Sequence, residues 1–294
     1  MKRAVLISAL HKKILRWYRQ NGRELPWRKT SDPYRILLSE IMAQQTQVSR
    51  VEIFYTKWLA KFPTLQSAAR AKTREILLQW SGLGYNSRAL RLHALAKFVV
   101  KNYRSRLPHS VEELQKLPGI GAYTSHAVAC FAFRQQLPVV DVNIKRILLR
   151  IFGYTTRLTD KEIWKLAEEI LPSGKAYHWN QALMDFGAVI CTARNPKCAI
   201  CPVQKECASA FSPMFNVPEK RKKKEPSRKG IPRRLYRGKI LKMLHYTVLT
   251  EKEIAEQLWH SFSSRDVLWL HNLLHQMIAD GLLKRLRGKL GIAE

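Results

Sequence analysis

The stretch LPGIGAYT, residues Leu117–Thr124, is the best starting point for interpreting this chain of 294 residues. It lies between two segments in which apolar residues recur at helical spacing. Glycine allows backbone conformations that are closed to other residues and lets a chain approach a ligand closely. A helix that begins directly after the glycines would aim free N–H groups outward, which suits a phosphate group. An isolated Gly-x-Gly is more often an ordinary turn between helices, so other observations must decide.

The net charge of the chain favours the interpretation of the two glycines as a phosphate site. The sequence holds 52 Lys and Arg against 22 Asp and Glu, a formal net charge of +30. Such an excess indicates a polyanionic partner and argues against a freely diffusing metabolic enzyme. The basic residues are spread along the chain instead of lying on one amphipathic helix, so nucleic acid is favoured over a membrane surface.

The apolar content allows a sizeable core but no membrane helix. Apolar residues make up 46% of the chain, and no run approaches the roughly 18 apolar residues that a membrane span needs. The apolar stretch Ala4–Leu10 ends in charged residues and has no small-residue cleavage site, so we expect no signal peptide.

The periodicity predicts an almost entirely helical fold. Few runs alternate, so no sizeable sheet is expected before residue 230, and Ser31-Asp32-Pro33 supplies capping residues for a helix that begins near Tyr34. Helical spacing of apolar residues is found in Ala4–Tyr18, Tyr34–Trp58, Thr73–Gln79, Ser87–Lys101, Val111–Leu117, Thr124–Phe133, Val142–Phe152 and Lys161–Ile170.

The C-terminal part differs in composition. Lys220–Lys239 has a net charge of +10 with two prolines and two glycines, which predicts a mobile basic linker or merely a solvated charge run. Thr250–Glu253 has the spacing of a capping box, a longer helix is expected over about Arg265–Ala279, and Gly281–Leu290 could form a hairpin. Helix, helix, helix, hairpin is the order of a winged helix, although a small packing domain would look similar.

Four of the five cysteines form a compact set, Cys191, Cys198, Cys201 and Cys207, with the spacing C-x6-C-x2-C-x5-C. Four thiolates on one short loop can hold a [4Fe–4S] cluster or a tetrahedral zinc ion, and their chemistry alone does not choose between the two. The clustering suits a metal site in a reducing compartment better than a disulfide framework. Cys130 lies in an apolar stretch and is expected in the core.

An acidic residue, Asp141, follows the glycines by about 20 positions in the stretch Val139–Asn143. A carboxylate between apolar residues is costly to bury unless it is paired or used. It could also cap a helix that begins near Asn143, which does not exclude a catalytic role.

Taken together, the glycine hairpin, the aspartate and the cysteine spacing resemble the helix-hairpin-helix base-excision DNA glycosylases with an iron–sulfur cluster. Within that superfamily the chain most resembles the MutY branch, the adenine glycosylases, over about residues 10–210. The resemblance selects the [4Fe–4S] cluster over zinc. The motifs that support the branch are LPWR (25–28), DPY (32–34), SEIMAQQTQV (39–48), GLGY (82–85) and QALMDFGA (181–188).

The resemblance implies a mainly α, two-lobed fold with DNA between the lobes. Residues 1–30 and 136–217 would form the iron–sulfur cluster lobe, and 31–135 the helix-hairpin-helix lobe. Residues 218–236 would be the basic linker, and 237–294 a small winged-helix-like module. The expected partner is double-stranded DNA that contains a mismatch or damaged base. The expected protein is an intracellular, DNA-associated monomer without a membrane partner; if its source is a prokaryote, it is expected in the cytoplasm or nucleoid.

The reaction that the resemblance implies is hydrolysis of the N-glycosidic bond of a base flipped out of the duplex. Glu40 matches the general acid, which must hold its proton near neutral pH. Asp141 matches the carboxylate that stabilises the oxocarbenium-like sugar, and Tyr123 and Asn143 match residues that support this pair. Superfamily members that also cleave the strand use a lysine at position 123 to form a Schiff base, so Tyr123 predicts a glycosylase without lyase activity.

The resemblance also assigns contacts with DNA. The wall of the base pocket matches Trp27, Arg28 and Gln181. The loop that probes the gap and the opposite base matches Gln44, Gln45 and Thr46, and a wedge into the base stack matches Tyr85. The amides of Gly119 and Gly121 match a site for backbone phosphate.

The chain departs from the pattern of the MutY branch in four places. Ala43 replaces a bulky apolar residue, Val142 a glycine and His126 a small residue. The usual C-terminal Nudix-like domain, which recognises 8-oxoguanine, has no counterpart. We therefore expect adenine opposite 8-oxoguanine or guanine as the substrate, with thymine or uracil opposite guanine as the alternative. A non-catalytic DNA-binding protein is the alternative of another class.

Overall fold

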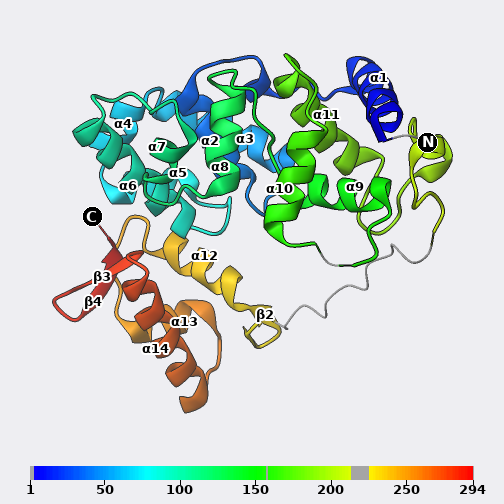
Figure 1. Ribbon diagram of the computed structural model, residues 1–294. Coiled ribbons are helices and arrows are strands. Elements are labelled where there is room, and N and C mark those ends of the chain that lie inside the picture. The colour runs from blue at the N-terminus through cyan, green and yellow to red at the C-terminus, as the bar shows by residue number, and fades with distance from the viewer. Residues whose placement is uncertain (1–2, 157, 213–224, 294) are drawn as a thin grey trace. The chain divides into compact units, whose positions relative to one another are not determined.

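The computed structural model describes residues 3–156, 158–212 and 225–293 (Figure 1). The chain divides into two compact units. The first comprises Met1–Leu37, His109–Lys116 and Ile120–Lys220, and the second comprises Leu38–Pro108, Leu117–Gly119 and Arg221–Glu294. Helix α2 (Pro33–Ala43) runs from one unit into the next.

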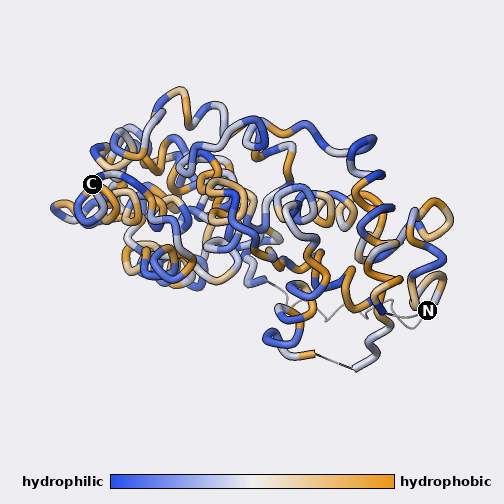
Figure 2. The backbone as a smooth tube through the Cα atoms, turned by 45° about the horizontal axis from the view of Figure 1, so that its top comes forward, coloured by the Kyte–Doolittle hydropathy of each residue, from blue (hydrophilic) through white to orange (hydrophobic). Residues whose placement is uncertain are grey.

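The first unit is built from helices around one core. Its helices are α1 (Arg3–Asn21), α7 (Val111–Gln115), α8 (Ala122–Phe131), α9 (Val142–Phe152), α10 (Asp160–Glu169) and α11 (Ala176–Val189). Short 3₁₀ turns cover Pro26–Arg28, Cys198–Ile200 and Gln204–Glu206. The core gathers Ile14 of α1, Ile147 of α9 and Trp179 of α11, each at most 1% exposed. Hydrophobic and hydrophilic stretches alternate along the backbone, as the orange and blue segments in Figure 2 show.

Within the second unit, α4 (Leu65–Arg70) and α5 (Thr73–Trp80) pack against α6 (Ser87–Asn102), and α5 also contacts α3 (Val48–Lys61). The rings of Trp58 and Trp80 meet edge to face, with centroids 5.6 Å apart. Both tryptophans are fully buried.

The C-terminal module, residues 227–293, starts with the two-residue strands β1 (Ser227–Arg228) and β2 (Ile231–Pro232). Three helices follow, α12 (Arg233–Met243), α13 (Glu251–Leu258) and α14 (Ser264–Ala279), and then the hairpin of β3 (Leu283–Leu286) and β4 (Lys289–Ile292). A β-bridge joins Leu249, ahead of α13, to Leu290 of β4. This is the element order expected of a winged helix.

The structure reproduces most of the expected helices and corrects three expectations. The segment 34–58 is two helices, because the chain turns at residues 44–47. Residues 227–236, expected in the linker, form β1, β2 and the start of α12. The helices α4 and α11 were not among the periodic segments. The rest of the expected linker, 213–224, lies outside the described residues.

Two further expectations concern burial and membranes. Cys130 is fully buried, as expected, and the side-chain amide of Asn180 donates to its Sγ at 3.3 Å. Among the helices that the structure describes, each is too short or too polar to cross a membrane.

Candidate active site and metal centre

Asp141 is the N-cap residue of α9, and both of its carboxylate oxygens are engaged. Oδ1 accepts the backbone N–H of Ile144 at 2.7 Å, and Oδ2 accepts the side-chain amide of Asn143 at 2.7 Å. The capping role expected from the sequence is thus confirmed. It leaves the carboxylate half-buried and held in one orientation.

A chain of hydrogen bonds connects Asp141 with the first cysteine. Asn143 accepts a hydrogen bond from Nη2 of Arg146 at 3.0 Å. The same guanidinium donates from Nε to the carbonyl of Cys191 at 2.9 Å and from Nη2 to the carbonyl of Gly187 at 2.8 Å. Burial lowers the pKa of Arg146, and the nearby Cys191 opposes that shift. Arg146 therefore ties the N-terminus of α9 to the C-terminal end of α11.

The close approach of α9 and α11 requires a glycine at position 187. A Cβ atom there would lie 2.7 Å from the Cβ of Asn143, which is too short for any real contact. The glycine of the motif QALMDFGA therefore has a physical reason, because a larger residue at position 187 would push Asn143 out of place.

The four clustered cysteines line one cavity of about 490 Å³. Four cysteines around one space are the donor set that a [4Fe–4S] cluster requires, so the residues present fit the cluster that the resemblance implies. Burial raises the pKa of the Cys201 thiol to about 11, so metal binding must release protons here.

Arg150 holds the start of the cysteine loop. It is 5% exposed, and its guanidinium donates to the Sγ of Cys191 at 3.5 Å and to the carbonyls of Thr192 and Ala193 at 2.7 and 2.9 Å. Its own carbonyl accepts the hydroxyl of Ser209. A guanidinium at this place offers positive charge to a thiolate ligand, which suits a metal cluster of net negative charge.

Glu40 is buried on α2, in the second unit, whereas Asp141 belongs to the first. The helix α2 begins where the sequence predicted, because Oδ1 of Asp32 accepts the N–H of Tyr34 at 2.9 Å. Glu40 lies in the apolar half of this helix, between the fully buried Leu38 and Met42.

The second unit contains a buried arginine that sequence reasoning did not single out. Nη1 of Arg88 donates to the carbonyls of Ile41, Met42 and Gln44 at 2.6–2.9 Å. Nη2 donates to the hydroxyl of Thr46 at 3.0 Å. The arginine thus closes the end of α2 and shapes the loop that carries Gln44, Gln45 and Thr46.

The same guanidinium also holds the turn that carries Tyr85. Nη2 of Arg88 donates to the carbonyl of Gly84 at 3.1 Å, and its Cζ lies 5.4 Å from the ring centroids of both Trp80 and Tyr85. No described Asp or Glu forms an ion pair with Arg88, and burial lowers its pKa to about 10. One cation therefore fixes both segments that the sequence assigns to DNA.

Both of these segments have strained backbones at exposed positions. Gln45 has φ 56° and Tyr85 has φ 49°, in the left-handed region. The side chain of Tyr85 is 52% exposed. Non-glycine residues adopt this conformation when the surroundings enforce it, and at functional sites in particular. The hydrogen bonds of Arg88 supply that constraint.

The substitution Arg88→Met should lower the free energy of unfolding by at least about 2 kcal/mol, because several buried carbonyls lose their donor at once. Urea denaturation followed by circular dichroism measures this. The matched control is Lys97→Met, which removes an exposed cation from the same helix. Equal stability of the two variants would show that the Arg88 bonds contribute nothing.

A helix begins directly after the glycine hairpin, as the sequence predicted. Gly119 has φ 79°, and Gly121 is the extended N-cap of α8. Both glycines are exposed, and Tyr123 is half-buried in the first turn of that helix. Two of the departures from the pattern are accommodated locally. The side chain of Val142 is 78% exposed, and the ring of His126 packs on Trp164 with centroids 4.4 Å apart.

Arg28 and Gln181, which the resemblance assigns to the base pocket, lie near Asp185, a buried aspartate of α11 that the sequence analysis named only as part of a motif. The guanidinium of Arg28 donates to both oxygens of Asp185 at 2.8 Å, and Arg23 adds its backbone N–H at 2.8 Å and its Nε at 2.7 Å. Gln181 is 5% exposed one turn earlier. Trp27 is half-buried in the 3₁₀ turn Pro26–Arg28.

Asp185 is fully buried, and its ion pairs govern its titration. Burial raises the pKa of Asp185. The hydrogen bonds and positive charges of Arg28 and Arg23 lower it by more, so the pKa lies below the ordinary value of 3.8. The ion pairs therefore stabilise the fold fully above that value, and their contribution is lost as the pH falls below it.

Replacing Asp185 by Asn should lower the free energy of unfolding by about 3–5 kcal/mol at pH 7, because two guanidinium groups lose their buried partner. The difference from the wild type should begin to shrink below about pH 3.8, where the carboxylate becomes protonated in the unfolded chain while the folded protein still keeps it charged. Denaturation curves from pH 7 to pH 3 test this. Glu24→Gln, which removes an exposed carboxylate paired with Lys29, should change little at any pH. A difference that stays constant with pH would contradict the assignment.

The residues that sequence reasoning missed are Arg88, Arg146, Arg150 and Asp185. A signal existed for two of them. Arg146 and Arg150 stand four residues apart in α9, next to its buried apolar face, and a cation at such a position needs acceptors. Nothing in the sequence alone shows that Arg88 faces carbonyl groups.

Comparison with known proteins agrees with this geometry. Residues 38–173 match the HhH-GPD superfamily base excision DNA repair protein family, and residues 191–207 match the iron-sulfur binding domain of endonuclease III. An adenine DNA glycosylase of Buchnera aphidicola subsp. Baizongia pistaciae is 38% identical over 244 residues, which cover 82% of this chain and 68% of that protein. An adenine DNA glycosylase of Mycolicibacterium smegmatis is 36% identical over 284 residues, or 92% of each chain.

Among solved structures, a thermostable thymine-DNA glycosylase is similar to this chain. Its TM-score is 0.68 at 34% sequence identity, and the match covers 71% of this chain and 99% of that one.

Proposed function

Because this chain belongs to the adenine DNA glycosylase family, we propose that its substrate is an adenine paired with guanine or 8-oxoguanine in double-stranded DNA. The enzyme is a base-excision DNA glycosylase with an iron–sulfur cluster. The observation that carries the proposal is the fixed carboxylate of Asp141. Two hydrogen bonds hold it at the start of α9, as a group that stabilises a sugar cation must be held.

Two carboxyl groups divide the chemistry. Glu40 donates its proton to N7 of the flipped adenine, which turns the base into a neutral leaving group. As the N-glycosidic bond breaks, positive charge develops on the sugar, and the carboxylate of Asp141 stabilises it. Water then adds to the sugar and its released proton returns to the Glu40 carboxylate, leaving an abasic site and free adenine. Asn143 orients Asp141 through the 2.7 Å hydrogen bond.

The cysteine loop plays a supporting part. Cys191, Cys198, Cys201 and Cys207 would hold the [4Fe–4S] cluster, which supplies redox-active iron and a covalent cross-link of the loop. Arg146 joins this loop to Asn143 and so to the orientation of Asp141. The cluster loop and the reacting carboxylate are therefore mechanically linked by side chains of this chain.

Tyr123 supports a glycosylase without lyase activity. A phenol cannot form the Schiff base by which a lysine at this position would cleave the strand. The reaction therefore ends at the abasic site.

The DNA contacts follow the same assignment. Trp27, Arg28 and Gln181 line the base pocket, and Tyr85 wedges into the stack. Gln44, Gln45 and Thr46 face the opposite base, and the amides of Gly119 and Gly121 bind backbone phosphate. The geometry that supports these roles is the Arg88 clamp on residues 44–46 and 84–85 and the left-handed backbone at Gln45 and Tyr85.

A second candidate substrate is thymine or uracil opposite guanine, which the likeness to the thymine-DNA glycosylase favours. The two chemistries differ at the leaving group. Thymine has no N7, so an enzyme that releases it must stabilise an anionic base by hydrogen bonds.

A panel of duplexes containing A·8-oxoG, A·G, T·G and U·G distinguishes the two. We expect release of adenine from the first two duplexes, with strand breaks only after alkali. Borohydride should trap no covalent complex. Efficient action on T·G or U·G alone would overturn the adenine assignment, and breaks without alkali would overturn the argument from Tyr123.

The substitution Glu40→Gln should slow adenine release by at least about 100-fold, because it removes the proton donor while preserving shape. Asp141→Asn should slow it by a similar factor, about 10²–10³, through loss of charge stabilisation. Single-turnover kinetics measures both rates, and equilibrium binding to the mismatch duplex should stay within a few-fold. The control is Glu112→Gln, an exposed carboxyl in the first turn of α7. Wild-type rates for Glu40→Gln would exclude it as the acid.

A further inference from the structure

We propose that the C-terminal module is a second DNA-binding unit, which places the outer face of α14 in the major groove of the duplex beside the mismatch. The tip of the β3–β4 hairpin then lies against the sugar–phosphate backbone. This inference rests on the proposed function, because it assumes that the module binds the same duplex that carries the mismatched base.

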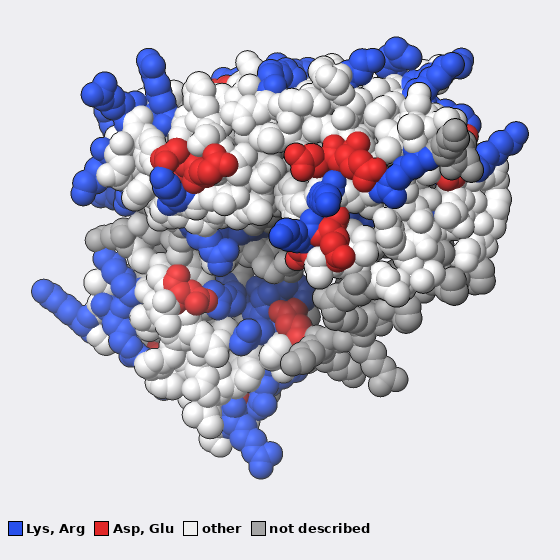
Figure 3. Space-filling model, viewed as in Figure 1, with Lys and Arg blue, Asp and Glu red and all other residues white. Residues whose placement is uncertain are grey.

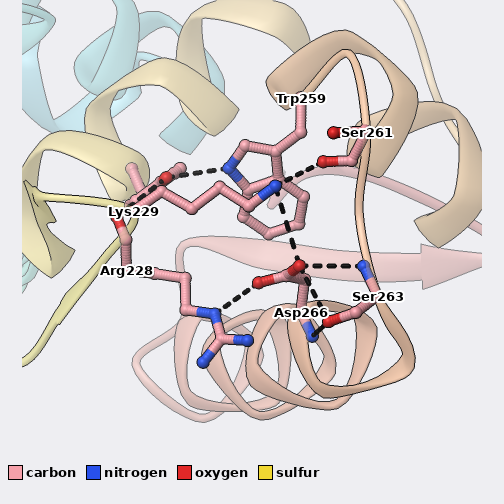
Figure 4. A network of polar contacts seen from close by, with 7 residues as sticks. Arg228, Lys229, Trp259, Ser261, Ser263 and Asp266 are labelled. Atoms are coloured by element: carbon pink, nitrogen blue, oxygen red, sulfur yellow. Dashed lines mark hydrogen bonds and ion pairs between the residues drawn. The ribbon is translucent and has the colours of Figure 1, made fainter.

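The first observation is the helix-turn-helix formed by α13 and α14. Only residues 259–263 separate the two helices, and the turn is clamped (Figure 4). Asp266, 4% exposed, accepts the N–H of Ser263 at 2.8 Å and forms ion pairs with Arg228 and Lys229. The ammonium group of Lys229 also donates to the carbonyl of Ser261. The start of α14 is therefore held rigidly, as docking into a groove requires.

Two aromatic residues, Trp259 and Tyr236, also hold this turn through hydrogen bonds. The indole N–H of Trp259 donates to the hydroxyl of Tyr236 at 2.8 Å, and that hydroxyl donates to the carbonyl of Arg228 at 3.1 Å. Tyr236 is fully buried. The β1–β2 turn, α12 and the helix-turn-helix thus form one packed unit.

The second observation is the division of α14 into two faces. Its inner face, Leu270, Leu273, Leu274 and Met277, is at most 2% exposed. Its outer face carries Arg265, Leu268, Asn272 and His275, spaced by three, four and three residues, and all are exposed. Leu268 is 62% exposed.

The outer face has the chemistry of base readout. Arginine pairs with the acceptors of guanine, asparagine pairs with adenine, and an apolar side chain contacts the methyl group of thymine. No acidic residue stands in this stripe, since Asp266 points into the clamp. An exposed leucine beside polar donors fits a groove better than it fits bulk water.

The third observation is the distribution of charge. Residues 227–293 hold thirteen Lys and Arg and five Asp and Glu, and each of the five acids has a partner inside the module. Glu251 pairs with His271 and Arg285, Asp266 with Arg228, Asp280 with Arg237 and Glu256 with Lys252, while Glu253 accepts the N–H of Thr250. The charge that remains for a partner is therefore positive.

Two of the remaining cations lie on the proposed surface. Within the described residues, Arg265 of α14 and Arg287 of the hairpin make no hydrogen bond or ion pair. Arg287 and Gly288 form the hairpin loop, with φ 48° and 81°, which is the two-residue turn of a tight hairpin. Figure 3 shows Lys and Arg side chains projecting from the outer edges of the module, in the lower part of the view. This charge favours a nucleic acid over a protein as the partner.

The test compares two double variants of the full-length protein. Arg265→Gln with Arg287→Gln removes two charges from the proposed surface. Lys239→Gln with Lys242→Gln removes two exposed charges from α12 and serves as the matched control. Binding is measured by fluorescence anisotropy on an undamaged duplex of about three helical turns, with each turn about 10 base pairs long. A series of salt concentrations gives the slope of log affinity against log salt.

We expect the first variant to bind at least five-fold more weakly, and its salt slope to fall by about 0.9 for each phosphate that is no longer neutralised. The control should stay within two-fold. On a mismatch duplex of about one turn, where the module has no flanking DNA to contact, both variants should excise the base at the wild-type rate. Unchanged melting temperatures would show that both variants are folded.

Three results would overturn the proposal. Wild-type affinity of the Arg265 and Arg287 variant would show that DNA does not occupy this surface, which would leave it to a protein partner. Equally weakened binding by the Arg265 and Arg287 variant and by the Lys239 and Lys242 control would show that the module attracts DNA by its overall charge and not through this surface. Slower excision by the Arg265 and Arg287 variant on the duplex of about one turn would show that these residues act without flanking DNA. Failure of the wild type to excise any base would refute the proposed function instead, and the binding comparison would still be interpretable.

Discussion

The contact between α9 and α11 is the constraint on which the site of the first unit depends. Gly187 lets the two helices approach until there is no room for a Cβ, and Arg146 then bonds both helix ends at once. Asn143 and Asp141 follow from this contact, because Arg146 orients the amide that orients the carboxylate. Arg150, one helical turn further along, extends the same face of α9 to the cysteine loop.

Buried arginines act in this molecule as organisers of backbone, and only some of them form ion pairs. Arg88 and Arg150 donate mainly to carbonyl groups, whereas Arg28 meets the buried Asp185. A planar guanidinium with five donors can satisfy several carbonyls at the irregular end of a helix, which a lysine cannot do. This explains how irregular loops keep one geometry although they lie outside regular helices.

The sequence predicted the helical class, the cysteine site, the cap at Asp141 and the order of elements in the C-terminal module. Each of these depends on local spacing, which a sequence displays directly. It did not predict the break after Ala43, because the apolar residues of α2 and α3 continue in helical phase across residues 44–47. It missed α11, where buried residues on most sides hide the periodicity. The roles of Arg88 and Asp185 depend on contacts with segments more than 40 positions away in the sequence. Such contacts cannot be predicted from a local sequence pattern.

The interleaving of the two units in the sequence has a consequence for the order of events during synthesis. The apolar face of α1 leaves the ribosome before its partners in the core, which lie on α9, α10 and α11. His11 and the carbonyl of Ile170, 2.8 Å apart, are separated by 159 positions. Long-range contacts of this kind form late, after most of the chain is available. Helix α1 is therefore made well before the helices that cover its apolar face, and its burial waits for them.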